Sequence, residues 1–158
     1  MTTTKLVLFS ILDVCKIHEQ RLQAALEYLN PFFPLSESRF LTLNNNDLGQ
    51  LEILTGRFAK LQDVIGSKVF PLLVDSMREN VKGSSFIDLL EHLEKIELIE
   101  SVEFWLELRK VRNFVSHEYP DNPKLMVDHL NKIYEATLKL LSYWQGLHSR
   151  IQTINLPD

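Results

Sequence analysis

Apolar side chains recur every three or four positions along most of this 158-residue chain. That spacing puts them on one face of a helix, and no stretch shows the two-residue alternation typical of a half-buried strand. The sequence therefore predicts an all-α fold. The clearest seam, suited to packing against neighbouring helices, consists of Leu51, Leu54, Phe58, Leu61, Ile65, Val69 and Leu72.

The first helix is expected over about residues 4–29. Pro31 and Pro34 follow it, and proline cannot continue a helix because it lacks the backbone N–H. The next segment, residues 30–46, has the prolines and polar residues of a loop. It also holds several phenylalanines and leucines. We therefore expect it to pack back on the helices rather than to act as a free linker.

Cap residues indicate where the later helices begin. Asp47 is predicted to cap the second long helix, with Gln50 completing a capping box, and Pro71 should kink that helix unless it ends earlier. A break at residues 83–85 follows. Ser85, together with Asp88 three residues on, is expected to cap a short helix.

The sequence predicts two more helices after residue 100. Ser101 can cap the first of them, which is expected to run to about residue 118 because Pro120 disfavours helical angles in the residue before it. Asn122 caps the final helix, with Pro123 in its first turn, and the pattern fades by about residue 149. The expected architecture is one domain over residues 1–158, an antiparallel four-helix bundle plus one short helix.

Composition excludes several classes of protein. Seventeen basic and 21 acidic residues give a net charge of −4, so the chain lacks the broad basic surface of most nucleic-acid-binding proteins. Cys15 is the only cysteine, which rules out an intrachain disulfide or a cysteine-rich zinc site and fits a reducing, cytoplasmic location. The apolar run within residues 1–12 is too short to span a bilayer, and we interpret it as the start of a core helix.

One short segment concentrates the chemistry of the chain: residues 112–119, Arg-Asn-Phe-Val-Ser-His-Glu-Tyr, followed by Pro120. On a helix over about 101–119, a core face is expected to hold Phe104, Leu108, Val111 and Val115. Arg109, Arg112, Asn113 and His117 then stand to the side and back of that helix, with Asn113 and His117 four positions apart and able to touch.

The predicted back face of the same helix also carries Val102 and Leu106. A helix that is apolar on two sides usually has something packed on both. We therefore expect this second face to meet another subunit or to line a cleft. Trp105 lies off the predicted core stripe, so it is assigned either to the core or to such a subunit interface.

The segment resembles the motif of the HEPN superfamily, in which an arginine precedes a histidine by five positions at a helix end. It is most similar to the HepT-type toxins of HEPN/MNT toxin–antitoxin pairs, which add an asparagine after the arginine and a tyrosine after the histidine. The matching residues here are Arg112, Asn113, His117 and Tyr119. The position on the penultimate helix also matches, so the resemblance spans roughly residues 47–144.

The resemblance implies a homodimer whose two motif helices form one composite cleft. Members of this kind are endoribonucleases that need no metal and no cofactor. It assigns catalysis to Arg112 and His117, with Asn113 orienting the histidine or the phosphate and Arg109 adding to a basic groove. It also implies that a partner MNT-type nucleotidyltransferase silences the toxin by adenylylating Tyr119. The roles are chemically reasonable, because an imidazole transfers protons near neutral pH and a guanidinium stabilises phosphate charge.

Two other functions stay open. The chain can instead be a non-catalytic HEPN companion, or substrate-binding, subunit of a small nucleotidyltransferase, which needs the fold but no cleavage. It can also be a helical adaptor with no link to nucleotides. The sequence contains no P-loop, no glycine-rich dinucleotide turn and no His-Glu-x-x-His zinc motif, so we expect no metal or cofactor.

Overall fold

A computed structural model describes residues 2–79, 83 and 85–157. The break predicted at residues 83–85 includes Ser84, and the apolar start includes Met1; these two residues lie outside the described part. All regular secondary structure among the described residues is helical, and none of these residues forms a strand, as the periodicity predicted. The elements are α1 (Thr3–Leu29), η1 (Asn30–Phe32), α2 (Glu37–Leu41), α3 (Asn45–Val64), η2 (Ile65–Val69), α4 (Phe70–Ser76), α5 (Phe86–Lys95), α6 (Val102–Asn113) and α7 (Pro123–Thr153).

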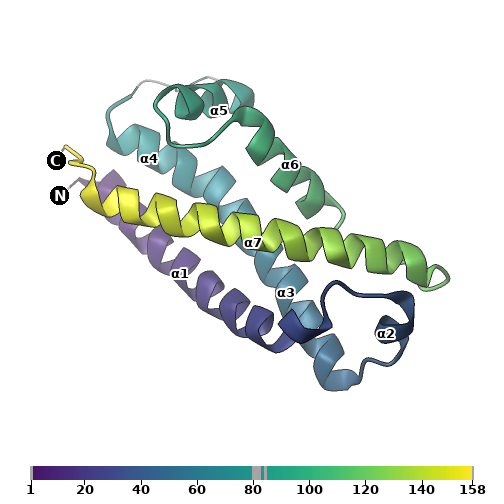
Figure 1. The fold of residues 1–158 in the computed structure, drawn as a ribbon. Coiled ribbons are helices and arrows are strands. Elements are labelled where there is room, and N and C mark those ends of the chain that lie inside the picture. The colour runs from purple at the N-terminus through teal and green to yellow at the C-terminus, as the bar shows by residue number, and fades with distance from the viewer. Residues whose placement is uncertain (1, 80–82, 84, 158) are drawn as a thin grey trace.

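The helices cross one another and enclose a single apolar core. Figure 1 shows α7 running across the whole molecule, with α1 and α3 on one side of it and α5 and α6 on the other. Contacts join α1 to α3 and α4, and α7 to α3 and α6. Both ends of the described chain lie at the same end of the molecule (Figure 1). None of the described helices is long and apolar enough to cross a membrane.

The cap of the second long helix lies three residues before the predicted one. Asn44 is the N-cap of α3, and its side chain accepts a hydrogen bond from the Asp47 backbone N–H at 2.9 Å. Asp47 closes the capping box from the third helical position, since its carboxylate accepts from the Asn44 N–H at 3.0 Å. The prediction of Asp47 as the cap was therefore wrong, because an asparagine upstream makes the same box with an acidic partner.

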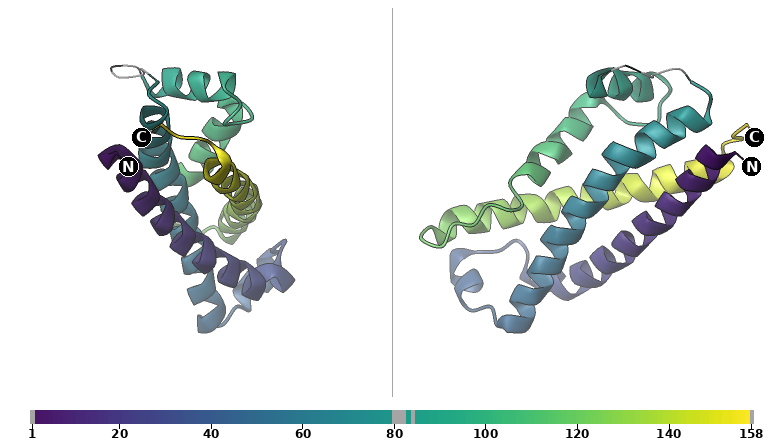
Figure 2. Two further views of the ribbon diagram at one scale, coloured as in Figure 1. Left: turned by 90° about the vertical axis from the view of Figure 1, so that its left-hand side faces the viewer. Right: turned by 180° about the vertical axis from the view of Figure 1, so that it is seen from behind.

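Pro71 does not end or sharply kink this helix. The chain instead passes from α3 through η2, a π-helical turn, into α4, and the three elements read as one rod in Figure 2. The Phe70 N–H bonds to the Ile65 carbonyl five residues back, rather than to the carbonyl four residues back. One extra residue in the turn accommodates a proline whose ring would otherwise clash with the preceding turn of an α-helix.

Residues 30–46 pack back on the helices, as predicted. Leu35 is buried, and both of its backbone polar groups bond to the side chain of Asn131 on α7, at 2.8 and 3.0 Å. The ring of Phe33 stacks on that of Tyr134 with 4.2 Å between centroids. The segment, which includes α2, therefore closes one end of the core against α7.

The predicted caps of the last three helices are confirmed, but one predicted end is wrong. Ser85, Ser101 and Asn122 each accept a hydrogen bond from the backbone N–H three residues ahead. Helix α6, however, ends at Asn113 rather than near residue 118. The chain leaves the helix at Phe114, whose ring packs on His129 of α7 with 4.4 Å between centroids.

Candidate functional site

Helix α6 faces the core through Leu108, as predicted, and through Trp105, which the sequence placed off the core stripe. Trp105 is fully buried and Leu108 is 2% exposed, whereas Phe104 and Val111 are only half-buried. Trp105 therefore belongs to the core and not to a subunit interface. The predicted second apolar face also packs inward, since Val102 and Leu106 lie against the core of the same chain.

This rotation of α6 directs Arg112 toward α3. Arg112 follows Trp105 and Leu108 at helical spacing, so it shares their side of the helix. Its Nε donates to Asp63 Oδ1 at 2.7 Å and its second terminal nitrogen donates to Asp63 Oδ2 at 2.9 Å. The prediction that Arg112 stands to the side and back of this helix was therefore wrong, because its guanidinium bonds to α3 of the same chain.

The Arg112–Asp63 pair is open to solvent. The side chains are 30% and 50% exposed, and the carboxylate raises the pKa of the Arg112 guanidinium through its hydrogen bond. Exposed ion pairs contribute about 0.2–1 kcal/mol because water competes for both partners, and a bidentate pair such as this one belongs at the upper end of that range. An anion such as a phosphate can therefore exchange with Asp63 at small cost.

Arg109 lies one turn before Arg112 and is exposed. Its guanidinium carbon lies over the ring of Phe86, 5.1 Å from the centroid, which is a cation–π contact. Beside it is a pocket of about 490 Å³, here called the π-turn pocket. It is bounded by Gln62, Asp63, Gly66 and Ser67 on α3 and η2, by Phe86 on α5, and by Trp105 and Arg109 on α6.

His117 and Tyr119 lie in the connection that follows α6. The Tyr119 hydroxyl and His117 Nδ1 are 3.3 Å apart, and either atom can be the donor. His117 is exposed and Tyr119 is half-buried. The predicted contact between Asn113 and His117 does not form on a helix, because α6 ends at Asn113. Asn113 itself is exposed.

His129 on α7 is a member of this cluster that the sequence did not reveal. Its ring meets Tyr119 edge-on with 5.0 Å between centroids, and Phe114 covers another side. Burial lowers the pKa of His129, and the charges of Lys132 and His117 lower it further against an opposing effect of Asp128. Only the fold brings α7, and His129 with it, beside the motif.

His129 Nδ1 has no hydrogen-bond partner among the groups that the structure describes, although it is buried. An unpaired buried imidazole nitrogen is unusual, because buried polar groups are nearly always hydrogen-bonded. The cluster thus contains two imidazoles, His117 and His129, with the Tyr119 hydroxyl bonded to the first and its ring against the second. Across the described chain, no hydrogen bond or ring contact joins either histidine to Arg112.

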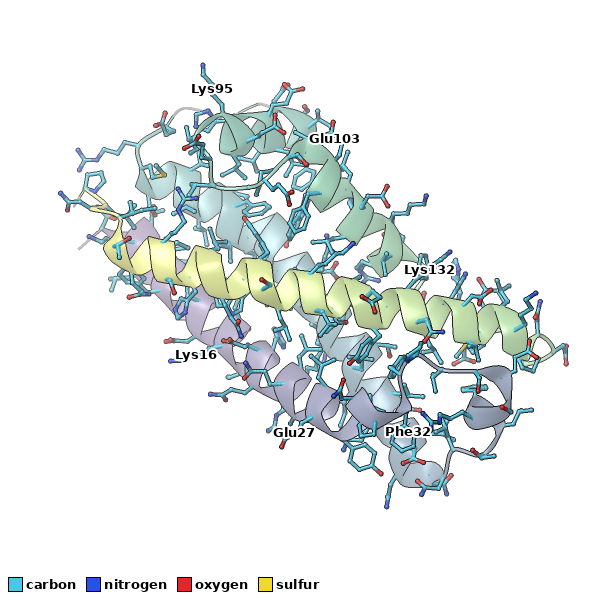
Figure 3. The ribbon with its side chains drawn as sticks, in the orientation of Figure 1. Lys16, Glu27, Phe32, Lys95, Glu103 and Lys132 are labelled. Carbon is cyan, nitrogen blue, oxygen red and sulfur yellow. The ribbon has the colours of Figure 1, made fainter. Side chains whose placement is uncertain are left out.

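The opposite side of α6 forms an open groove with α7, with a volume of about 880 Å³. Phe104, Val111 and Phe114 supply its apolar floor. Its rim carries carboxylates, including Glu103, and ammonium groups, including Lys132, which are labelled in Figure 3. The face of α6 that was predicted to be the core is therefore partly open.

Neither a metal-binding cluster nor the cysteine thiol provides a second reactive site among the described residues. The described residues contain no cluster of three or more histidine, cysteine or carboxylate side chains able to hold a metal ion. Cys15 is fully buried, and burial raises the pKa of its thiol to about 12, so it is not a thiolate near neutral pH.

Comparison with known proteins identifies no relative: no protein-family model matches the chain, and no curated protein and no solved structure matches it.

Proposed function

We propose that this chain is a HepT-like member of the HEPN superfamily, a metal-independent RNA endonuclease that acts as a homodimer in the cytoplasm. The supporting observation is the cluster of His117, Tyr119 and His129 at the end of α6, a helix that also presents Arg109 and Arg112. In this proposal α1, the α3–η2–α4 rod, α6 and α7 are the four helices of a HEPN-type bundle.

The proposed reaction is an internal transesterification. The ribose 2′-oxygen attacks the adjacent phosphorus as its proton passes to a neutral imidazole, and the bond from phosphorus to the 5′-oxygen breaks. A protonated imidazole gives its proton to that leaving oxygen. The products are a 2′,3′-cyclic phosphate and a free 5′-hydroxyl, so no water, metal or cofactor is consumed.

His129 is suited to be the base and His117 the acid. Burial favours the neutral form of His129 by lowering its pKa, whereas His117 is exposed beside the Tyr119 hydroxyl. Arg112 would stabilise the charge that develops on the phosphate oxygens after exchanging Asp63 for the substrate. Asn113 and Arg109 stand on the same helix end to orient the phosphate.

The groove between α6 and α7 is the surface we assign to the second copy. A two-fold axis pairs each patch with itself, so a self-complementary surface needs both charges. This groove has them, with Glu103 on α6 and Lys132 on α7 around an apolar floor. The motif ends of the two α6 helices would then lie near the axis.

Modification of Tyr119 by an MNT-type nucleotidyltransferase would silence this site directly. The Tyr119 hydroxyl is bonded to His117 Nδ1, and its ring lies against His129. Attaching a nucleotide to that oxygen removes the hydrogen bond, adds negative charge and covers both imidazoles. The same oxygen therefore links the proposed activity to its proposed control.

One observation favours a second candidate, the non-catalytic companion subunit of a nucleotidyltransferase. Arg112 is occupied by Asp63 within its own chain, which is an adequate structural role for an arginine. In this alternative the motif stabilises the fold and α6 presents a surface to the partner enzyme, with no cleavage of RNA.

Cleavage of RNA by the purified dimer separates the two candidates. Wild type should produce 2′,3′-cyclic phosphate ends in the presence of a metal chelator. Arg112→Ala and His117→Ala should each lower the rate by about 100-fold or more, the usual contribution of a general acid–base group or a charge-stabilising donor. His148→Ala, which removes a histidine stacked on Trp144 instead, is the matched control and should cleave normally.

The same three variants should behave in parallel in growth. Expression of wild type and His148→Ala should arrest growth, and expression of the two motif variants should not. Equal cleavage by all four proteins, or none by wild type, would exclude the proposed ribonuclease and leave the companion subunit or the helical adaptor.

A further inference from the structure

The π-turn pocket lies against the Arg112–Asp63 pair, because Asp63 belongs to both. Its volume of about 490 Å³ falls in the usual range for small-molecule sites, roughly 300–1,000 Å³. Gly66 of η2 lines the pocket at a point where an added Cβ would lie 3.2 Å from the Trp105 ring, so the absence of a side chain lets Trp105 pack closely there. Single π-turns within α-helices often mark functional sites.

Two polar groups in the wall of this pocket have no partner. Gln62 is 4% exposed, and its side-chain amide, which has no hydrogen bond to a described group, is not among the fully buried atoms and so reaches the open space of the pocket. Trp105 Nε1 also lacks an acceptor among the described residues, but it is fully buried beside Gly66. The Gln62 amide is therefore the polar group of this wall that a ligand in the pocket can reach, and it has no competing partner among the described residues.

The chemistry of the wall defines that ligand. A primary amide offers both a donor and an acceptor, which matches the paired groups on the polar edge of a heterocyclic base. Phe86 presents an aromatic ring at the mouth, and Arg109 lies over it. Bases stack on aromatic rings and on guanidinium planes.

We propose that the π-turn pocket binds one nucleobase of a single-stranded RNA, whose adjacent phosphate lies between Arg109 and Arg112. The two arginines are one helical turn apart on α6, so a single phosphate can reach both. The Gln62 amide forms hydrogen bonds with the edge of the base. The phosphate replaces Asp63 as the partner of Arg112. This inference rests on the proposed function, since it supplies the base-binding subsite of the same cleavage site.

Nuclear magnetic resonance of the indole N–H groups tests the pocket without any cleavage. The chain has two tryptophans, and Trp144 donates to Glu19 at 3.1 Å away from the pocket, so its signal is an internal reference. AMP, GMP, CMP and UMP are titrated separately into the full-length wild-type protein. At least one should shift the Trp105 signal to saturation, whereas ribose 5-phosphate, which lacks a base, should not.

Gln62→Leu is the decisive variant. It removes the amide but keeps a similar volume, so the affinity for the nucleotide should fall roughly tenfold, the cost of a lost hydrogen bond to a buried group. The unfolding temperature should not fall, because an unpaired buried amide is replaced by an apolar group. Gln50→Leu, the same change three turns earlier on α3, is the matched control and should bind as wild type does.

Any of three results would refute nucleotide binding in the π-turn pocket. No nucleotide at millimolar concentration shifts the Trp105 indole signal, the Trp144 signal shifts equally, or Gln62→Leu binds the nucleotide as tightly as wild type. RNA cleavage is measured in the same samples, so the two proposals fail separately. Binding without cleavage retains the pocket and removes the nuclease. Cleavage without binding does the reverse.

Discussion

Replacing glycine by alanine is predicted to lower the free energy of unfolding at Gly66 and to raise it at Gly56. The difference arises from the contact between Gly66 and Trp105. Gly66 lies in the π-turn, where an added Cβ would be 3.2 Å from Trp105 Cζ2 and 3.3 Å from Nε1. Gly56 lies in α3, and a Cβ there would meet nothing within 4 Å. Neither glycine has a positive φ. Alanine is therefore compatible with the backbone at both positions.

The magnitudes follow from two terms. Replacing glycine by alanine within a helix stabilises the folded state by roughly 0.5–1 kcal/mol, because the unfolded chain loses freedom. At Gly66 the new methyl must also displace Trp105, which is fully buried and packs edge-on against Phe70 with 4.7 Å between centroids. Overpacking of that kind costs about 1–3 kcal/mol. The expected net change is about +0.5 to +1 kcal/mol for Gly56→Ala and about −1 kcal/mol for Gly66→Ala.

Urea unfolding followed by circular dichroism measures both free energies. The denaturant slope for a small domain is about 1–3 kcal/mol per molar, so a difference near 2 kcal/mol moves the midpoints apart by roughly 1 M. The difference between the two variants removes the backbone term that they share. What remains is the cost of pressing a methyl group against the Trp105 ring.

If Gly66→Ala raises the free energy of unfolding as much as Gly56→Ala does, Trp105 is not held against η2. The π-turn pocket would then lose the wall on which the base-binding proposal depends. If both variants lose stability equally, the cause lies in the backbone of the rod rather than in the tryptophan contact.

Two further predictions concern the motif. Asp63→Asn removes the carboxylate that competes with phosphate for Arg112, so single-stranded RNA should bind up to about fivefold more tightly, the equivalent of an exposed ion pair of roughly 1 kcal/mol. Asp75→Asn, the same charge change on an exposed residue of α4, is the control for titrations by fluorescence anisotropy; equal tightening by both variants would exclude a specific role for Asp63. Burial lowers the pKa of His129, so the unfolded chain takes up this proton at a higher pH than the folded chain does. The stability that neutral His129 permits is present above the pKa of the unfolded chain and should decline as the pH falls through the pKa of the folded chain. Thermal unfolding between pH 7.5 and 5.5 should therefore show a smaller decline in unfolding temperature for His129→Gln than for wild type.

The sequence by itself determined the helical class and most of the helix starts. Apolar spacing of three to four residues is a local property, and so are caps such as Ser85, Ser101 and Asn122, whose side chains bond only three residues ahead. The motif residues Arg112 and His117 could also be singled out from the sequence, because the resemblance that carries them is a pattern of eight consecutive positions.

Only the tertiary structure decided which way those residues face and what they meet. The rotation of α6 is set by burying Trp105 against η2, and this directs Arg112 to Asp63 of α3, a residue far away in the sequence. The early end of α6 follows from the packing of Phe114 on His129 of α7. Such contacts depend on the simultaneous packing of several helices, a non-local sum of small energies that no short window of sequence contains.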